Sequence, residues 1–130
     1  MDDDSGFTFT GRIRSFGCAL KGVRVMVASQ HNAWVHAAAT AALLTAGLHF
    51  RLGRDEWCWV ILAVIAVWTA EALNTAFEFL TDVASPEFHP VAAQAKDVAA
   101  GAVLITALGS VLIGLLILGP HALARLDAWR

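Results

Sequence analysis

Three long runs of uncharged, mostly apolar residues divide the chain. They cover residues 33–50, 57–70 and 98–119, and the second run stays predominantly apolar beyond residue 70. A helix needs about 20 such residues to cross the hydrocarbon core of a bilayer. We therefore predict three transmembrane helices, at about 33–50, 56–83 and 91–119, with the last turns of the second outside the hydrocarbon.

Helix-breaking and charged segments separate these runs. Residues 51–56 form a short charged turn, and residues 85–90 form a loop with two prolines. Proline lacks the backbone N–H that a helix interior uses, so Pro120 is predicted to end the third transmembrane helix. We expect residues 1–130 to form a single membrane domain.

The segment before the first run has an amphipathic pattern. Its apolar residues recur at alternating intervals of four and three, which places them on one helical face. Arg14 and Lys21 point away from that face. This pattern predicts a helix at about 7–30 that lies in the membrane surface, and a helix that binds a soluble partner is the alternative. The apolar positions are Phe9, Ile13, Phe16, Leu20, Val23 and Val27.

The composition agrees with a membrane protein. Hydrophobic residues make up 58% of the chain and charged residues 15%, and the mean hydropathy is +0.62. A soluble monomer of this size could not cover so much apolar surface, and a disordered chain is also excluded. The net charge of −2 provides no broad basic field, so nucleic acid is not an expected partner.

Small residues follow one face of the third run at every fourth position. Such a stripe lets helix backbones approach closely, and packing within the bundle is its simplest interpretation. The polar content of the three spans must be shielded from lipid, which favours a homo-oligomer. The stripe consists of Ala102, Thr106, Ser110 and Gly114.

Three spans place the N-terminal helix and the 84–97 loop on the same side of the membrane. Five Lys and Arg residues fall on that side and four on the other. The excess favours the cytoplasmic side for the N-terminal helix and this loop.

Four polar residues of the second predicted span share one narrow helical face, because they are three, four and four residues apart. Acidic residues at membrane depth are energetically costly and usually mark a function. Hydrogen bonding between helices and a carboxylate-lined proton or cation pathway are the alternatives. The residues are Glu71, Asn74, Glu78 and Asp82.

This face also suits phosphoryl transfer. One carboxylate can bind Mg²⁺ together with substrate phosphates, while another removes a proton from a hydroxyl. Lys96, next to Asp97 just before the third uncharged run, can meet the phosphates of a nucleotide. Glu71 lies deeper than Glu78, where a lipid alcohol presents its hydroxyl. His31, His36 and His49 are interpreted as interfacial or packing residues.

Two sequence blocks resemble the small prokaryotic diacylglycerol kinase/undecaprenol kinase family. The first is EALNTAFE at 71–78 followed by Asp82, and the second is AKDVAAGAV at 95–103. The segments Lys21-Gly22 and 30–36 also look like the family's exit from its surface helix. The resemblance covers about residues 9–119.

The resemblance implies an all-α integral membrane homotrimer, in which each chain has a surface helix and three transmembrane helices and active sites are shared between subunits. It implies a kinase of the bacterial inner membrane, facing the cytoplasm, that phosphorylates diacylglycerol or undecaprenol with ATP and Mg²⁺. Glu71 would be the general base, Asn74 would orient the reacting groups, and Glu78 would hold the metal.

The resemblance further implies a set of nucleotide-binding residues. One of them departs from the family pattern, because Gln30 stands where well-known members have a metal-binding glutamate. A glutamine can ligate Mg²⁺ only through a neutral carbonyl oxygen. Gln30 is therefore expected to hold the metal more weakly or to contact phosphate, and a catalytically impaired structural protein is the alternative. The expected nucleotide-binding residues are Arg12, Arg14, Lys21, Gln30, Asp82, Lys96 and Asp97.

Overall fold

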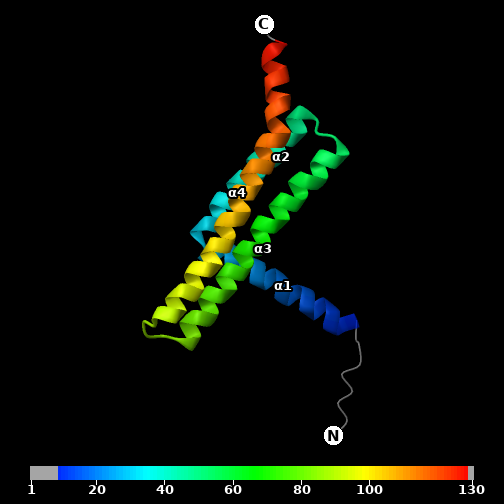
Figure 1. Ribbon diagram of the computed structural model, residues 1–130. Coiled ribbons are helices and arrows are strands. Elements are labelled where there is room, and N and C mark those ends of the chain that lie inside the picture. Colours follow the sequence, from blue (N-terminus) through cyan, green and yellow to red (C-terminus); the bar gives the residue numbers. More distant parts are fainter. Residues whose placement is uncertain (1–8, 129–130) are drawn as a thin grey trace.

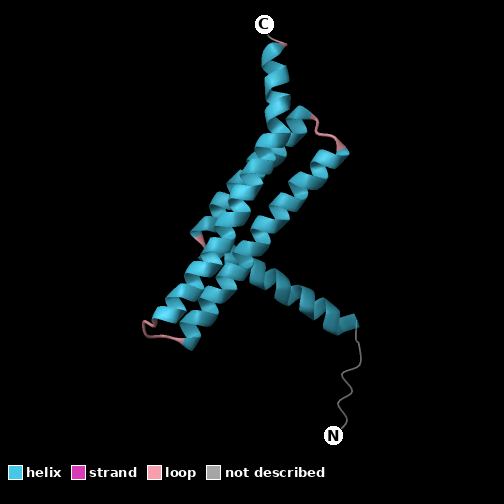
Figure 2. Cartoon of the chain, in the orientation of Figure 1, coloured by secondary structure: helices cyan, strands magenta, loops and turns pink. Residues whose placement is uncertain are grey.

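The computed structural model describes residues 9–128 and is helical almost throughout that range (Figures 1 and 2). Four helices follow one another along the chain, joined by short connections. They are α1 (Phe9–Ser29), α2 (His31–Phe50), α3 (Arg54–Ala84) and α4 (Pro90–Asp127).

Helices α2, α3 and α4 lie alongside one another, and α1 leaves this bundle at an angle (Figure 1). Each of the three is long and apolar enough to cross a membrane, which confirms the predicted number of spans. In α3, 39% of the most apolar window is buried, against 11% in α2 and α4. Helix α3 is therefore the central helix of the chain, because the other helices pack against it.

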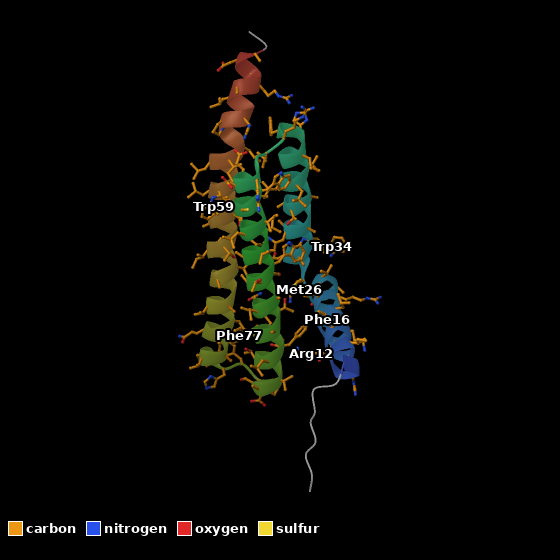
Figure 3. All side chains as sticks on the ribbon, turned by 90° about the vertical axis from the view of Figure 1, so that its right-hand side faces the viewer. Arg12, Phe16, Met26, Trp34, Trp59 and Phe77 are labelled. Carbon is orange, nitrogen blue, oxygen red and sulfur yellow. The ribbon has the colours of Figure 1, made fainter. Side chains whose placement is uncertain are left out.

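Helix α1 leaves most of its apolar face uncovered. Phe16 is 72% exposed and Leu20 is 71% exposed, whereas Met26 near the bundle is buried (Figure 3). An uncovered apolar face fits a helix that rests on a membrane surface, although that placement stays a prediction. Residues 7 and 8 of the predicted helix lie outside the described residues.

A tight turn joins α2 to α3. Arg51 adopts the left-handed conformation with φ 56°, and the backbone N–H of Leu52 donates to the carbonyl of Gly47 at 3.1 Å. This geometry is a Schellman motif, which satisfies the last carbonyls of a helix. A Cβ atom at Gly47 would lie 2.8 Å from Cη2 of Trp57, so this position accepts only glycine without movement of the indole.

The prediction that Pro120 ends the third membrane helix is wrong, because α4 continues through Pro120 to Asp127. Figure 1 shows that α4 changes direction in its orange-to-red part, as expected where a proline removes one backbone hydrogen bond. Just past the proline, Nε2 of His121 lies 2.8 Å from Oε1 of Glu56 on α3. This contact ties the extended end of α4 to the start of α3.

Cys18 and Cys58 are both free and exposed. The stripe of small residues packs partly within the chain, because Oγ of Ser110 donates to the carbonyl of Ala63 on α3 and Gly114 faces Leu43 on α2. These contacts agree with packing inside the bundle.

Candidate active site

The polar face of α3 runs from a fully buried carboxylate to an exposed one. Glu71 is 0% exposed and Asn74 is 4% exposed, Glu78 is half-buried, and Asp82 is exposed. At a helical rise of about 1.5 Å per residue, Glu71 and Glu78 are about 10 Å apart along the axis. Burial within the chain therefore decreases along this face from Glu71 to Asp82.

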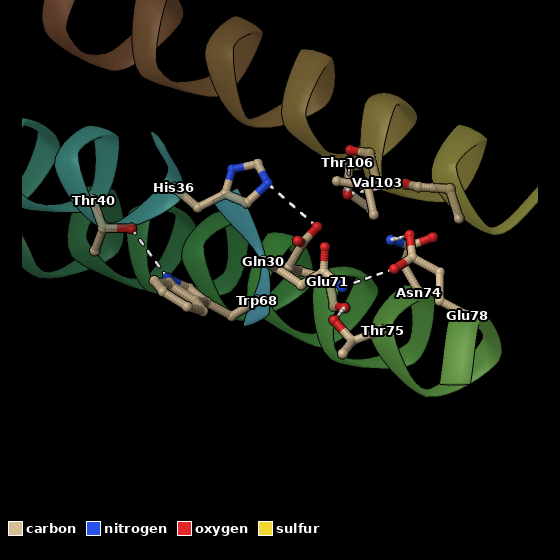
Figure 4. A network of polar contacts seen from close by, with 11 residues as sticks. Gln30, His36, Thr40, Trp68, Glu71, Asn74, Thr75, Glu78, Val103 and Thr106 are labelled. Carbon is tan, nitrogen blue, oxygen red and sulfur yellow. Dashed lines mark hydrogen bonds and ion pairs between the residues drawn. The ribbon is translucent and has the colours of Figure 1, made fainter. Parts of the chain in front are cut away.

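Two neutral amides hold the carboxylate of Glu78. Nε2 of Gln30 donates to Oε2 at 2.7 Å, and Nδ2 of Asn74 donates to Oε1 at 3.1 Å (Figure 4). Gln30 reaches this position because it is the single non-helical residue between α1 and α2. Both donors are uncharged amides, so these two hydrogen bonds do not balance the charge of Glu78.

The carboxylate of Glu71 is buried differently. Neither of its oxygens has a hydrogen-bond partner, and Nε2 of His36 on α2 lies 3.6 Å from Oε2 (Figure 4). The interpretation of His36 as an interfacial or packing residue did not anticipate this contact. The one signal in the sequence was its place six residues after Gln30, close to the spacing between Glu71 and Glu78 on α3.

Helices α2 and α3 are joined by a polar seam that runs antiparallel. Its contacts follow the order 30, 36 and 40 on the α2 side and the opposite order, 78, 71 and 68, on α3. In the third contact of the seam, Nε1 of Trp68 donates to Oγ1 of Thr40 at 3.1 Å. The three pairs of this seam are Gln30 with Glu78, His36 with Glu71, and Thr40 with Trp68.

A salt bridge closes the end of the bundle near the α3–α4 loop. Nζ of Lys96 lies 2.9 Å from Oδ1 of Asp82, and the two side chains are 40% and 65% exposed. Asp97 follows on the exposed surface of α4. The structure thus brings together Lys96 and Asp82, two of the predicted nucleotide-binding residues.

The basic residues of α1 lie elsewhere in the single chain. Arg12, Arg14 and Lys21 are exposed on α1. Within residues 9–128, no hydrogen bond or ion pair joins Arg14 or Lys21 to the polar residues of α3. One chain alone therefore does not assemble the whole predicted nucleotide site.

The polar residues of α3 are suited to Mg²⁺. Mg²⁺ is usually bound by one or two carboxylates together with substrate phosphates, and not by a cage of protein ligands. Within the described range, no group of three or more His, Cys, Asp or Glu side chains could hold a metal ion. The carboxylate of Glu78 is held by uncharged donors, and Oδ1 of Asn74 is a buried oxygen without a partner. These oxygens fit a hard cation near Glu78.

An apolar groove of about 740 Å³ runs between α3 and α4 and reaches Asn74. Leu73 and Phe77 line it from α3, and Val98 and Ala102 line it from α4. An apolar molecule can therefore approach the polar residues without crossing charged surface.

Comparisons with known proteins point to one family. The family model described as prokaryotic diacylglycerol kinase matches residues 17–118. The matched stretch contains Gln30, His36, the polar face of α3 and Lys96, whereas Arg12 and Arg14 precede it.

Individual relatives agree with the family model. An undecaprenol kinase of Bacillus subtilis is 39% identical over 107 residues, which are 82% of this chain and 87% of that protein. A diacylglycerol kinase of Synechocystis sp. is 35% identical over 111 residues, 85% of this chain and 63% of that protein. A diacylglycerol kinase of Escherichia coli is 32% identical over 120 residues, 87% of this chain and 93% of that protein.

Proposed function

Because the chain belongs to the prokaryotic diacylglycerol kinase family, we propose that it transfers the γ-phosphoryl group of ATP to the hydroxyl of a membrane lipid alcohol. Diacylglycerol and undecaprenol, the lipids in the names of its relatives, are the two substrates to test. The observation that carries the proposal is the cluster of Glu71, Asn74, Glu78 and Gln30 in a bundle of three candidate membrane spans. The apolar groove beside Asn74 gives a lipid chain an approach to this cluster.

In this proposal Glu71 is the general base. Its oxygens are buried and accept no hydrogen bond, so a lone pair is available for the proton of the lipid hydroxyl. Asn74 lies one turn away with Oδ1 unpartnered, and we assign it the role of orienting the reacting groups. Water is excluded here because Glu71 and Asn74 are almost completely buried.

Glu78 would hold Mg²⁺, which neutralises phosphate charge and polarises the transferred group when bound. Gln30 is bonded to Glu78 through its N–H₂ group, so the glutamine holds the ligand carboxylate in place. Its carbonyl oxygen remains the atom through which Gln30 itself would meet the metal.

The nucleotide would bind at the loop end of the bundle. Lys96 offers an ammonium group to the phosphates. Asp82 and Asp97 lie on the same nucleotide side, where Asp97 contacts the adenosine or orders the loop. Phosphate contact would draw Lys96 away from Asp82, which the exposure of both side chains permits.

A homotrimer in the bacterial inner membrane, with the site facing the cytoplasm, completes the proposal. A neighbouring chain would then supply the basic residues of α1, namely Arg12, Arg14 and Lys21. Two observations support a shared site. Among the described residues of one chain, Arg14 and Lys21 form no hydrogen bond or ion pair with the polar residues of α3, and many large apolar side chains are left exposed for a neighbouring chain to cover. Membership in a kinase family and the Lys96–Asp82 pair both favour this function over an ion pathway.

The test is phosphorylation of each lipid by the purified protein in detergent, with labelled ATP and Mg²⁺. Wild type is expected to label at least one lipid. Glu71→Gln is expected to label neither, because a side-chain amide cannot accept the proton of the hydroxyl at neutral pH. Glu56→Gln makes the same chemical change at the opposite end of α3 and should keep full activity. Activity in Glu71→Gln would remove the base assignment, and inactivity of folded wild type would support the impaired structural alternative.

A further inference from the structure

Glu71 is the largest completely buried side chain of the described residues, and its carboxylate has no hydrogen-bond donor. A buried polar group without a hydrogen-bond partner is energetically costly. A general base must also present one oxygen to the substrate hydroxyl in a fixed orientation. Some group must therefore hold this carboxylate in place.

His36 is the one side chain placed to do so. Its Nε2 atom is buried without a hydrogen-bond partner, and it lies 3.6 Å from the equally unpartnered Oε2 of Glu71. This separation is longer than a hydrogen bond but within ion-pair range. A small rotation of either side chain would form one bond that satisfies both atoms.

The other groups around Glu71 do not compete for its carboxylate. On α3, Thr75 donates to the backbone carbonyl of Glu71, and Asn74 donates to Glu78. On α4, the hydroxyl of Thr106 donates to carbonyls of its own helix. Gln30, at the break before α2, donates to Glu78. The titratable groups near this site are therefore Glu71, His36 and, about 10 Å along α3, Glu78.

We propose that His36 is a positioning residue for the general base. In this role its Nε2–H donates to Oε2 of Glu71, which holds the carboxylate in place and turns Oε1 toward the lipid hydroxyl. The inference rests on the proposed function, in which Glu71 is that base.

Oε1 of Glu71 takes the proton of the lipid hydroxyl while the hydroxyl oxygen bonds to the γ-phosphorus of ATP. The bond between the γ-phosphorus and the β–γ bridging oxygen breaks, and ADP leaves with that electron pair. The proton stays on Glu71 while ADP leaves, and it passes to solvent only after the phosphorylated lipid has left the site. His36 keeps its own proton throughout.

Two substitutions of His36 separate positioning from packing. His36→Leu removes the donor and keeps an apolar side chain, whereas His36→Gln places an amide N–H₂ close to the position of Nε2. We expect His36→Leu to lower kcat at least tenfold with an unchanged KM for ATP, and His36→Gln to recover most of kcat. Thr40→Val, which removes the next polar contact along the same seam, serves as the matched control and should keep wild-type kcat.

An infrared spectrum gives a readout that loss of packing would not move. His36→Leu should show the carboxylate stretch of Glu71 at the frequency of a group without this hydrogen bond, a band that is absent from wild type. The band should disappear in the double variant with Glu71→Gln, which assigns it to that residue.

Three results would overturn the inference. The first is a wild-type kcat in His36→Leu, and the second is a lowered kcat without rescue by glutamine and without the infrared band. If Glu71→Gln is inactive in those cases, only the role of His36 fails. The third is activity in Glu71→Gln, which removes the base itself and with it the proposed mechanism.

Discussion

Replacing Gln30 with glutamate tests how the Glu78 carboxylate is held. In the native chain the Gln30 amide donates to Oε2 of Glu78 at 2.7 Å. Gln30→Glu removes a hydrogen bond to a charged group, worth about 1.5–3 kcal/mol, and sets two carboxylates side by side. At a separation of about 4 Å and an effective dielectric constant of about 20, their repulsion is about 4 kcal/mol.

Because position 30 is half-exposed and a glutamate there can turn toward solvent, we expect about 2–4 kcal/mol of lost stability without metal. Mg²⁺ placed between the two carboxylates should restore most of that loss and should bind the variant more tightly than wild type. Thermal unfolding in detergent, with EDTA or with millimolar MgCl₂, measures both effects.

Asn32→Asp is the matched control, since it adds one negative charge two residues away at an exposed position of α2. This control should unfold at nearly the same temperature as wild type in either buffer. If Gln30→Glu unfolds like wild type in EDTA and gains nothing from MgCl₂, then position 30 is outside the metal site and the hydrogen bond to Glu78 contributes little.

Two further predictions concern the opposite ends of the bundle. Gly47→Ala places a methyl group 2.8 Å from the indole of Trp57 and should cost roughly 1–3 kcal/mol in detergent unfolding, whereas Gly109→Ala, in open space, should not destabilise. Equal losses in both variants would show that the Trp57 contact is not limiting. Lys96→Met should raise the KM for ATP about tenfold or more through loss of a charged phosphate contact, with little loss of stability because its pair with Asp82 is exposed. An unchanged ATP dependence would remove Lys96 from the nucleotide site.

The number and type of helices could be predicted from the sequence because a bilayer imposes a simple requirement. A spanning helix must be long and nearly uncharged, and three segments of the chain meet that requirement. The shared face of Glu71, Asn74 and Glu78 could also be predicted, since helical periodicity alone determines it.

Contacts between helices could not be predicted in the same way, because they depend on how the helices cross. Nothing in the spacing of the histidines alone distinguishes His36, which faces Glu71, from His31, which is exposed. The helix end at Pro120 was mispredicted for a related reason. One missing backbone hydrogen bond costs a helix about 3 kcal/mol, and the contact of His121 with Glu56 shows that tertiary structure holds the chain in place beyond it.

The antiparallel seam between α2 and α3 separates the carboxylates of the site, which lie on α3, from the side chains that hold them, which lie on the α2 side. Each seam residue at positions 68, 71 and 78 of α3 has a single partner on the α2 side, at 40, 36 and 30. Protein engineering can therefore leave the carboxylates untouched and randomise only positions 30 and 36, the partners of Glu78 and Glu71. Such a library would vary the activity of the base through position 36 and the affinity for the cation through position 30, independently of each other.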